Sequence, residues 1–278
     1  MSRDFRQVDV FTSAAYQGNP VAVVHGADGL TDEQMQQFAN WTNLSETTFL
    51  LEPADAGADY RVRIFMPGSE LPFAGHPTLG SCHAWLEAGG QPARADVIVQ
   101  ECKAGLVSLR RTGPGLAFAA PPLVRSGPVD EPLAERVAQA LNLAPADIVD
   151  LQWADNGPGW VAVLLDSAAA VLAVRPGALD PDLNLGIAGP YPPGSPEALE
   201  VRAFFRKDGA TTEDPVTGSL NASLAQWLTG TGRISAPYVA SQGTVLGRRG
   251  RVSISRDDDG QVWVAGGTVT CITGTVER

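Results

Sequence analysis

Basic residues are scarce in this sequence, and no long run of lysines and arginines occurs in it. Lys103 and Lys207 are the only lysines among twenty basic residues, and thirty-one acidic residues bring the formal net charge to −11. Proteins that bind nucleic acid draw much of their affinity from clustered Lys and Arg side chains. The composition therefore argues against a nucleic-acid-binding protein, while an acidic surface says little about a substrate.

Cysteines and long apolar segments are scarce as well. Cys82, Cys102 and Cys271 are odd in number and have no C-x-x-C spacing, which argues against a disulfide framework and fits a reducing compartment. No segment reaches the roughly 20 apolar residues of a membrane span, and the first residues lack the apolar core of a signal peptide. We therefore expect a cytoplasmic protein that does not enter a membrane.

Histidines are too few to indicate a metal centre. The chain has three, His25, His76 and His83. His76 and His83 lie seven residues apart and could share a helix face, but no third ligand is spaced with them. We expect no metal ion, and we interpret His25 and His83 as structural or solvated residues.

The apolar pattern is typical of an α+β protein. Hydrophobic residues make up 44% of the chain, enough for a sizeable core, and typical domain sizes favour two domains of about 130–140 residues. Strand and helix patterns do not alternate regularly, which argues against a doubly wound sheet. The predicted helices are 31–42 (with Thr31 and Gln34 as a capping box), 76–88, 131–142 and 217–229. The predicted strands are 5–12, 20–25, 47–52, 60–66, 96–102, 105–111, 147–153, 159–165 and 200–206.

One short pattern occurs in both halves, which Gly113-Pro114-Gly115 separates. The strand segment Val62-Arg63-Ile64-Phe65 is followed by a loop, the residues Ala74-Gly75-His76-Pro77 and a helix. Val201-Arg202-Ala203-Phe204 is followed by its own loop, Pro215-Val216-Thr217-Gly218 and a helix. Two four-residue matches arise by chance, but each copy also places polar residues where a helix begins.

Such helix starts are candidate binding sites for a small carboxylate. Unpaired backbone N–H groups and the helix dipole favour anions there. For either motif alone, the simpler interpretation is that Gly-His-Pro or Asp-Pro only begins a helix, and the matching contexts favour a functional one. Glu46 lies between a helix and a strand, where a carboxylate is usually solvated. It is still the best candidate for a general base, because partial burial can bring its pKa towards the working pH.

Several longer motifs follow one another along nearly the whole chain. They are Val8-Asp9-Val10-Phe11, Gly18-Asn19-Pro20-Val21-Ala22-Val23-Val24, Asn43-Leu44-Ser45-Glu46-Thr47, Phe73-Ala74-Gly75-His76-Pro77-Thr78, Glu213-Asp214-Pro215-Val216-Thr217-Gly218-Ser219, and Gln242-Gly243 with Gly247-Arg248-Arg249-Gly250. Together these motifs resemble the PhzF family of phenazine-biosynthesis-like isomerases.

The resemblance implies a diaminopimelate-epimerase-like α+β fold. Two pseudo-symmetric domains would each have a curled β-sheet around a central helix, with the active site in the cleft between them. With the Val-Arg-x-Phe repeat, it implies an N-terminal domain of residues 1–115, to which 266–278 return, and a C-terminal domain of residues 116–265. It also implies a homodimer and a reaction that needs neither a metal nor an organic cofactor.

The resemblance also implies roles for particular residues. The Glu of the N-L-S-E motif transfers the proton in the family, and here it is Glu46. His76 of A-G-H-P and Asp214 of E-D-P would assist catalysis. The implied substrate-binding residues are Ser45, Gly75, Gly218 and Ser219. The implied activity moves a proton on a small carboxylated substrate, similar to trans-2,3-dihydro-3-hydroxyanthranilate isomerase. The substrate stays open, because segments 184–196 and 208–212, which we expect to be loops, carry no motif.

Two other functions stay open at this point. Related epimerases and racemases use two cysteines, one at each helix start, but here we expect Ala74 and Pro215 at those positions, and Cys82 lies well inside a helix. A non-catalytic relative that only binds a small molecule is the other alternative. Glu46, His76 and Asp214 are all present, which counts against it, and proton exchange on a ligand would decide the question.

Overall fold

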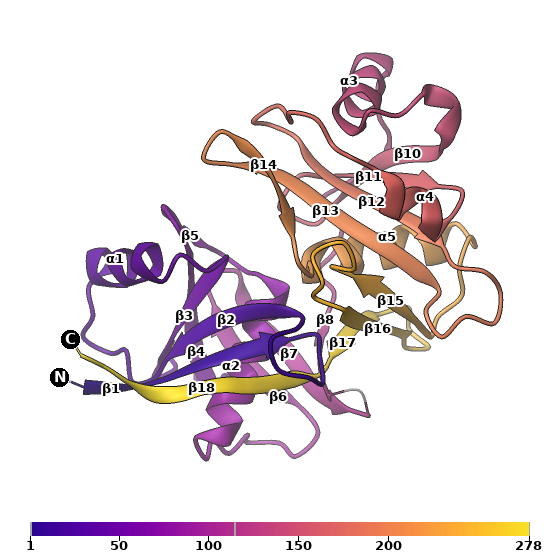
Figure 1. Cartoon of the computed structure of the whole chain (residues 1–278). Coiled ribbons are helices and arrows are strands. Elements are labelled where there is room, and N and C mark those ends of the chain that lie inside the picture. The colour runs from indigo at the N-terminus through magenta and orange to yellow at the C-terminus, as the bar shows by residue number, and fades with distance from the viewer. Residues whose placement is uncertain (1, 114, 278) are drawn as a thin grey trace. The chain divides into compact units, whose positions relative to one another are not determined.

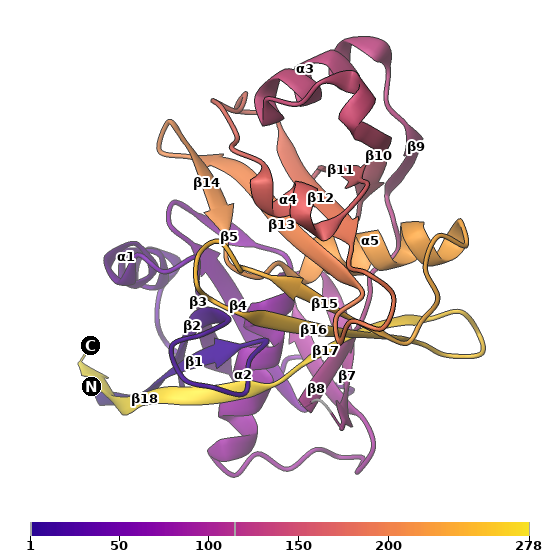
Figure 2. The ribbon, with the colours of Figure 1, turned by 45° about the vertical axis from the view of Figure 1, so that its right-hand side comes forward.

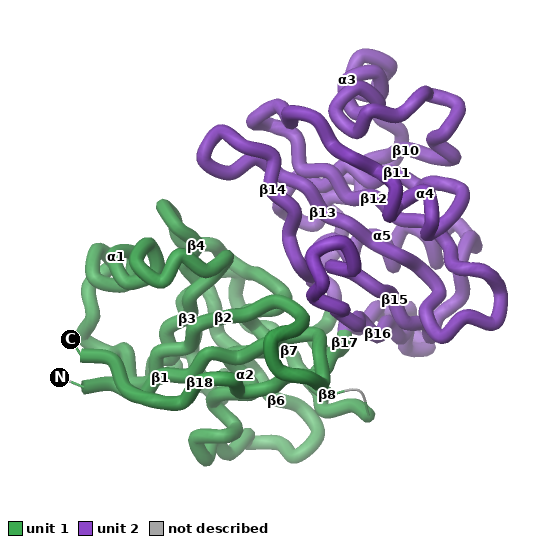
Figure 3. The backbone as a smooth tube through the Cα atoms, in the orientation of Figure 1, with its two compact units in different colours: residues 1–119, 265–278 green, residues 120–264 purple. Residues whose placement is uncertain are grey.

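The computed structural model describes residues 2–113 and 115–277, and the chain divides into two compact units (Figure 3). Unit 1 comprises residues 1–119 and 265–278, and unit 2 comprises residues 120–264. None of the helices formed by the described residues is long and apolar enough to cross a membrane.

Unit 1 is a curled sheet around a central helix, α2 (Gly75–Glu87) (Figure 1). The other helix is α1 (Asp32–Thr42), and the strands are β1 (Ser2–Val10), β2 (Asn19–Val24), β3 (Glu46–Leu51), β4 (Tyr60–Met66), β5 (Ser69–Leu71), β6 (Ile98–Cys102), β7 (Gly105–Thr112), β8 (Gly115–Ala119) and β18 (Thr268–Glu277). The strand order is β18-β1-β2-β3-β4-β6-β7-β8, and β5 forms a hairpin with β4. Because α2 contacts β1, β2 and β3 as well as β8 and β18, the sheet wraps around it.

The sequence of α2 suits this central position. Nine of its residues are buried, from Gly75 to Cys82 and Ala84, and a helix that is buried on most of its surface belongs inside a core. Gly80 lets the helix approach the sheet closely. A Cβ atom there would lie 2.4 Å from Val21 Cγ1 and 3.1 Å from Val10 Cγ2.

We expect the substitution Gly80→Ala to destabilise the protein. Overpacking of a dense core typically costs about 1–3 kcal/mol, which exceeds the gain in helix propensity of about 1 kcal/mol that alanine brings. The free energy of unfolding from urea titrations checks this. Gly230→Ala is the matched control, since apart from its chain neighbours and the backbone of its own helix no described atom lies within 4 Å of the Cβ position at this helix end. Equal stability of the two variants would contradict the close packing of α2.

Unit 2 has its own central helix, α5 (Gly218–Gly230) (Figure 2). Its other helices are α3 (Glu131–Leu141), the short 3-10 helix η1 (Pro145–Asp147) and α4 (Ala168–Ala173), and its strands are β9 (Arg125–Pro128), β10 (Ile148–Asp155), β11 (Trp160–Leu165), β12 (Asn184–Pro190), β13 (Leu199–Lys207), β14 (Ala210–Asp214), β15 (Tyr238–Gln242), β16 (Gly250–Arg256) and β17 (Val262–Gly266). The chain returns to unit 1 along β17. Like α2, α5 is largely buried.

The two units repeat the same strand pairings. In unit 1, β1 with β2 and β3 with β4 are antiparallel, whereas β2 with β3 and β4 with β6 are parallel. In unit 2, β10 with β11 and β12 with β13 are antiparallel, and β11 with β12 and β13 with β15 are parallel. The hairpins β4–β5 and β13–β14 each lead into a central helix. The predicted α+β class is therefore confirmed.

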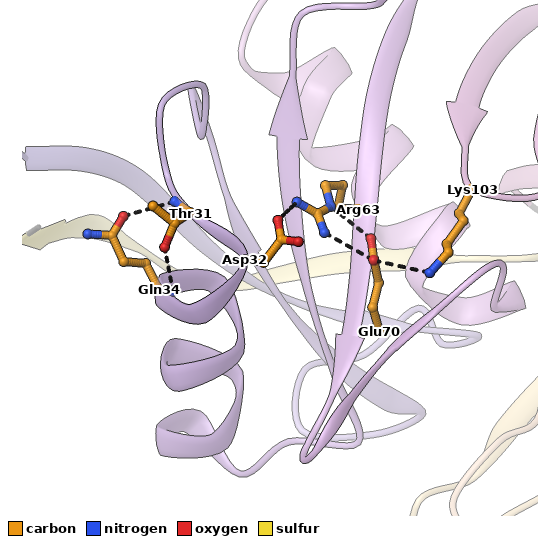
Figure 4. A network of polar contacts seen from close by, with 6 residues as sticks. All are labelled: Thr31, Asp32, Gln34, Arg63, Glu70 and Lys103. Atoms are coloured by element: carbon orange, nitrogen blue, oxygen red, sulfur yellow. Dashed lines mark hydrogen bonds and ion pairs between the residues drawn. The ribbon is translucent and has the colours of Figure 1, made fainter.

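An arginine clamp marks the repeat at the level of side chains. Arg63 donates from Nε and Nη2 to Glu70 Oε1 and Oε2 at 2.7 and 3.0 Å (Figure 4). Arg202 donates from the same two atoms to both oxygens of Glu213 at 3.0 and 2.8 Å. Each guanidinium also lies about 5 Å from the ring of the Phe two residues on. Both glutamates lie five residues before the first residue of the central helix, so each clamp anchors the loop that leads into it.

Two expectations about loops were wrong. The segment 184–196 contains β12, a strand inside the sheet of unit 2, because Gly186 and Gly189 make room for neighbours. A Cβ at Gly186 would lie 2.2 Å from Leu220 Cδ1 of α5, and one at Gly189 would lie 2.4 Å from the Ser167 carbonyl oxygen. The segment 208–212 is the tight Asp208-Gly209 turn and the start of β14. Strands often carry glycine where another element packs closely against them. Such a strand looks like a loop in the sequence.

The predicted capping box of the first helix is confirmed. Thr31 is the N-cap of α1, its Oγ1 accepts from the Gln34 N–H at 3.3 Å, and the Thr31 N–H donates to Gln34 Oε1 at 3.0 Å (Figure 4). Asp32 in the first turn accepts from Arg63 Nη1 at 2.6 Å. The clamp on β4 therefore also holds the start of α1.

Candidate active site

Three polar side chains of unit 1 meet where their elements begin. Asn19 is the first residue of β2, Glu46 the first of β3, and His76 the second of α2. Glu46 Oε2 lies 3.3 Å from His76 Nε2, and Asn19 Nδ2 lies 3.3 Å from His76 Nδ1. The side chain of His76 is 5% exposed and that of Glu46 17%, so the imidazole is buried and the carboxylate partly open to a ligand.

Local structure explains why Glu46 points to this place. The helix α1 ends at Thr42, and Asn43 takes the left-handed conformation that commonly ends helices. Three residues after Asn43, β3 begins at Glu46, in parallel register with Val21 of β2. Ser45 is half-buried next to Glu46. The predicted unit 1 residues Ser45, Glu46, Gly75 and His76 thus all lie at the start of β3 or of α2.

Burial keeps the imidazole of His76 neutral. Desolvation lowers the pKa of His76 to about 3, and a hydrogen bond to the Pro20 carbonyl opposes this shift. Although a carboxylate 3.3 Å away would favour the imidazolium, burial dominates. The approach of Glu46 Oε2 to His76 Nε2 also lacks the alignment of a hydrogen bond. Such contacts often tighten only when a substrate binds, so the pair is a carboxyl group beside a neutral ring.

The neutral histidine predicts a pH-dependent stability. Between pH 6.5 and about 3 the unfolded chain binds a proton at this residue that the folded chain does not bind, so stability falls as the pH falls. From pH 7 to pH 5 this group alone costs on the order of 2 kcal/mol. We expect the free energy of unfolding to fall more over this range in the wild type than in His76→Gln. Equal losses would show that the imidazole is not buried in its neutral form.

In unit 2 the predicted residue Asp214 is the last residue of β14, just before α5. Its Oδ2 accepts a hydrogen bond from Thr217 Oγ1 at 2.5 Å. Gln242 of β15 is fully buried and contacts the same loop, since its Oε1 accepts from the Thr217 N–H at 3.0 Å. Polar groups from β14, β15 and the start of α5 therefore form one network.

Ser219 is the second residue of α5, the position that His76 has in α2. Trp160 Nε1 donates to its Oγ at 3.0 Å, and Asn156 Nδ2 donates to its carbonyl oxygen at 2.9 Å. A hydroxyl that accepts from the indole can direct its own proton elsewhere. Gly218, the first residue of α5, is buried beside it. Asp214, Gly218 and Ser219 therefore all lie at the start of α5.

The two helix starts correspond residue by residue. Ala74 is the N-cap of α2 and Thr217 the N-cap of α5, and neither side chain makes a capping hydrogen bond. Thr217, and not Pro215 as the sequence suggested, is thus the counterpart of Ala74, because α5 begins three residues after Pro215. Neither position carries a thiol. Cys82 lies in the middle of α2, where burial raises its pKa to about 12, so two-thiol racemisation has no support.

Sequence reasoning missed four polar residues beside these helix starts. They are Asn19, Asn156, Trp160 and Gln242. Asn19 and Gln242 belong to the motifs Gly18-Asn19-Pro20 and Gln242-Gly243, a signal that could have marked them. Asn156 and Trp160 lie in no such motif, and only the turn between β10 and β11 brings them to α5. The described residues contain no group of three or more His, Cys, Asp and Glu side chains arranged to hold a metal ion.

Solved structures share this architecture. A phenazine biosynthesis protein of the PhzF family from Bacillus anthracis has a TM-score of 0.84 at 23% identity, with 100% of both chains covered. A hydroxyproline epimerase from Agrobacterium vitis has a TM-score of 0.59 at 14% identity, covering 99% of this chain and 92% of its own. The curled sheets around central helices therefore define an α+β protein of the class that PhzF proteins share with epimerases.

Sequence comparison then identifies the family. The model described as "Phenazine biosynthesis-like protein" (PhzC-PhzF) matches residues 8–274. Antisense-enhancing sequence 1 of Schizosaccharomyces pombe is 34% identical over 292 residues, with 97% of each chain covered. Trans-2,3-dihydro-3-hydroxyanthranilate isomerase of Pseudomonas aeruginosa is 35% identical over 265 residues, covering 91% of this chain and 90% of its own. The chain belongs to the phenazine biosynthesis-like (PhzF) family of isomerases, which confirms the resemblance found in its motifs.

Proposed function

We propose that this protein is a cofactor-independent isomerase in which Glu46 moves a proton on a small carboxylated substrate. The observation that carries the proposal is the 3.3 Å approach of Oε2 of Glu46, whose side chain is 17% exposed, to the buried Nε2 of His76. A carboxylate beside a neutral imidazole can accept a proton and return it. General acid–base catalysis by one positioned group typically contributes about 10²–10⁴-fold to a rate.

The proton balance of the step is simple. Glu46 removes an acidic C–H proton, the electron pair of that bond shifts along the substrate, and the same carboxyl group returns the proton to another carbon on the same face. His76 Nε2 lies close enough to share the proton while Glu46 holds it. One base is sufficient for such a shift, so the reaction does not need the two thiols of the epimerases.

Residues at the helix starts bind the substrate in this proposal. The N–H groups at Gly75 and Gly218, which open α2 and α5, suit a carboxylate, because helix N-termini favour anions. Ser45 and Ser219 supply hydroxyl groups beside them. Asp214 orients an amino or hydroxyl group of the substrate. Trans-2,3-dihydro-3-hydroxyanthranilate, the substrate in the name of a 35% identical relative, is a compound of this kind and the first one to test.

The test is proton exchange in deuterated water. The purified protein is incubated with trans-2,3-dihydro-3-hydroxyanthranilate, and NMR follows the ring carbons. We expect isomerisation, with the migrating proton partly retained or replaced by deuterium at one ring carbon. The absence of both turnover and exchange would reject this substrate. Exchange at a carbon with inversion at the same carbon, and no shift of a double bond, would instead favour a racemase.

We also propose that the protein acts as a cytoplasmic homodimer, as the family resemblance implies. Light scattering coupled to gel filtration measures the mass in solution. A mass near twice the 29.2 kDa of one chain is expected, and a mass of one chain at all concentrations would contradict the dimer.

A further inference from the structure

The buried side chain of Gln242 has one possible orientation. Its Oε1 faces the backbone N–H of Thr217 at 3.0 Å and Asn221 Nδ2 at 2.8 Å. A backbone N–H can only donate, so the atom that faces it must be the oxygen of the amide. Its Nε2 then donates to Thr217 Oγ1 at 2.9 Å and to the Asp214 carbonyl oxygen at 3.2 Å.

This orientation fixes the direction of the next hydrogen bond. Because Gln242 Nε2 can only donate, Thr217 Oγ1 accepts from it, and the single hydroxyl proton of Thr217 is left to donate. Asp214 Oδ2 lies 2.5 Å from Thr217 Oγ1, the short distance of a hydrogen bond to a carboxylate. Asp214 Oδ2 is therefore an acceptor and carries no proton. The hydrogen bonds therefore form a chain with one direction of donation, from Gln242 to Thr217 and from Thr217 to Asp214.

The start of α5 does not require this chain of hydrogen bonds in order to form. The loops Glu70–Gly75 and Glu213–Gly218 have equal length and the same arginine clamp. Unit 1 has Leu71 and Ala74 where unit 2 has Asp214 and Thr217, and α2 still begins at Gly75. The threonine hydroxyl does not cap α5 either. Among the described residues, the Thr217 hydroxyl contacts the side chains of Gln242 and Asp214. The group that these hydrogen bonds act on is therefore the Asp214 carboxylate.

We propose that Thr217 and Gln242 are positioning residues that hold the Asp214 carboxylate in one rotamer, with Oδ2 unprotonated, for the isomerisation. The proposal rests on the proposed function. Asp214 so held can only accept hydrogen bonds at that oxygen. It thereby selects substrates that present an amino or hydroxyl donor and discriminates against those that present a keto oxygen.

The test compares three variants. Thr217→Val removes the hydroxyl at almost constant shape, and Thr217→Ser keeps it. Thr229→Val is a matched control on α5, where the Thr229 hydroxyl donates to the Ala225 carbonyl oxygen at 2.6 Å. We expect Thr217→Val to lower kcat/KM about 10–100-fold, the range for a hydrogen bond to a charged group. We expect Thr217→Ser to restore the rate to within about threefold of wild type, and Thr229→Val to leave it unchanged.

A crystal structure of Thr217→Val gives a second readout that needs no substrate. We expect the Asp214 side chain to leave its wild-type rotamer, and an unchanged rotamer would overturn the proposal. Glu46→Gln, assayed in parallel, separates the two hypotheses. Normal turnover by Glu46→Gln would reject the proposed function, whereas lost turnover there with normal turnover by Thr217→Val would reject the positioning role alone. A Thr217→Ser variant as slow as Thr217→Val would also contradict it.

Discussion

The substitution Glu46→Gln is expected to lower turnover at least about 10²-fold, and up to about 10⁴-fold, while the substrate still binds. Glutamine keeps the shape of the side chain at the start of β3 but removes the oxygen that accepts a proton. The remaining contacts at the start of α2 do not depend on the charge of Glu46. Steady-state kinetics together with calorimetric binding of the substrate would measure the two effects separately.

The control for this variant makes the same chemical change elsewhere in unit 1. Glu33 lies on the exposed face of α1, and Glu33→Gln is expected to leave kcat unchanged. Turnover of Glu46→Gln within a few-fold of wild type would show that Glu46 is not the base. Loss of binding as well as turnover would assign Glu46 to substrate binding and leave the base to be found.

The second large effect is expected at the buried arginine clamp of unit 2. The side chains of Arg202 and Glu213 are 3% and 10% exposed. Glu213→Gln leaves the guanidinium buried without its charged partner, and breaking such a pair typically costs about 3–5 kcal/mol. Arg202 also donates to the Val171 and Val174 carbonyls, which hold it in place and prevent it from reaching solvent. Denaturant unfolding would measure the loss.

The repeated clamp of unit 1 provides the matched control. In Glu70→Gln, Arg63 still keeps Asp32 as a partner at 2.6 Å, and both clamp side chains are more exposed, at 18% each. Arg63 holds the pKa of Glu70 below its usual value. We expect the loss in Glu70→Gln to be clearly smaller than in Glu213→Gln. The reverse order would mean that burial does not control the strength of these pairs.

Local patterns predicted the elements well where a single segment carries the signal. The capping box of Thr31 and Gln34 and the alternation through residues 60–66 depend on residues close in the chain, and both elements form as expected. The strand β12 was mistaken for a loop. Gly186 is a glycine because a larger side chain there would collide with Leu220, which lies more than thirty residues further along the sequence. No window of sequence around Gly186 contains that reason.

For the candidate site, too, the sequence predicted one part and only the tertiary structure determined the other. The motifs, by their resemblance to the family, pointed to Glu46, His76 and Asp214 and to the two helix starts. The family and the α+β class followed from the sequence alone, because motifs in a fixed order along the chain can be recognised without any knowledge of contacts. Tertiary structure decided the rest. The meeting of Asn19, Glu46 and His76 depends on three elements beginning at one place, and the neutral state of His76 depends on burial. The direction of the hydrogen bonds from Gln242 through Thr217 to Asp214 depends on Gln242, which lies 25 positions from Thr217 and 28 from Asp214, and only three-dimensional geometry determines it.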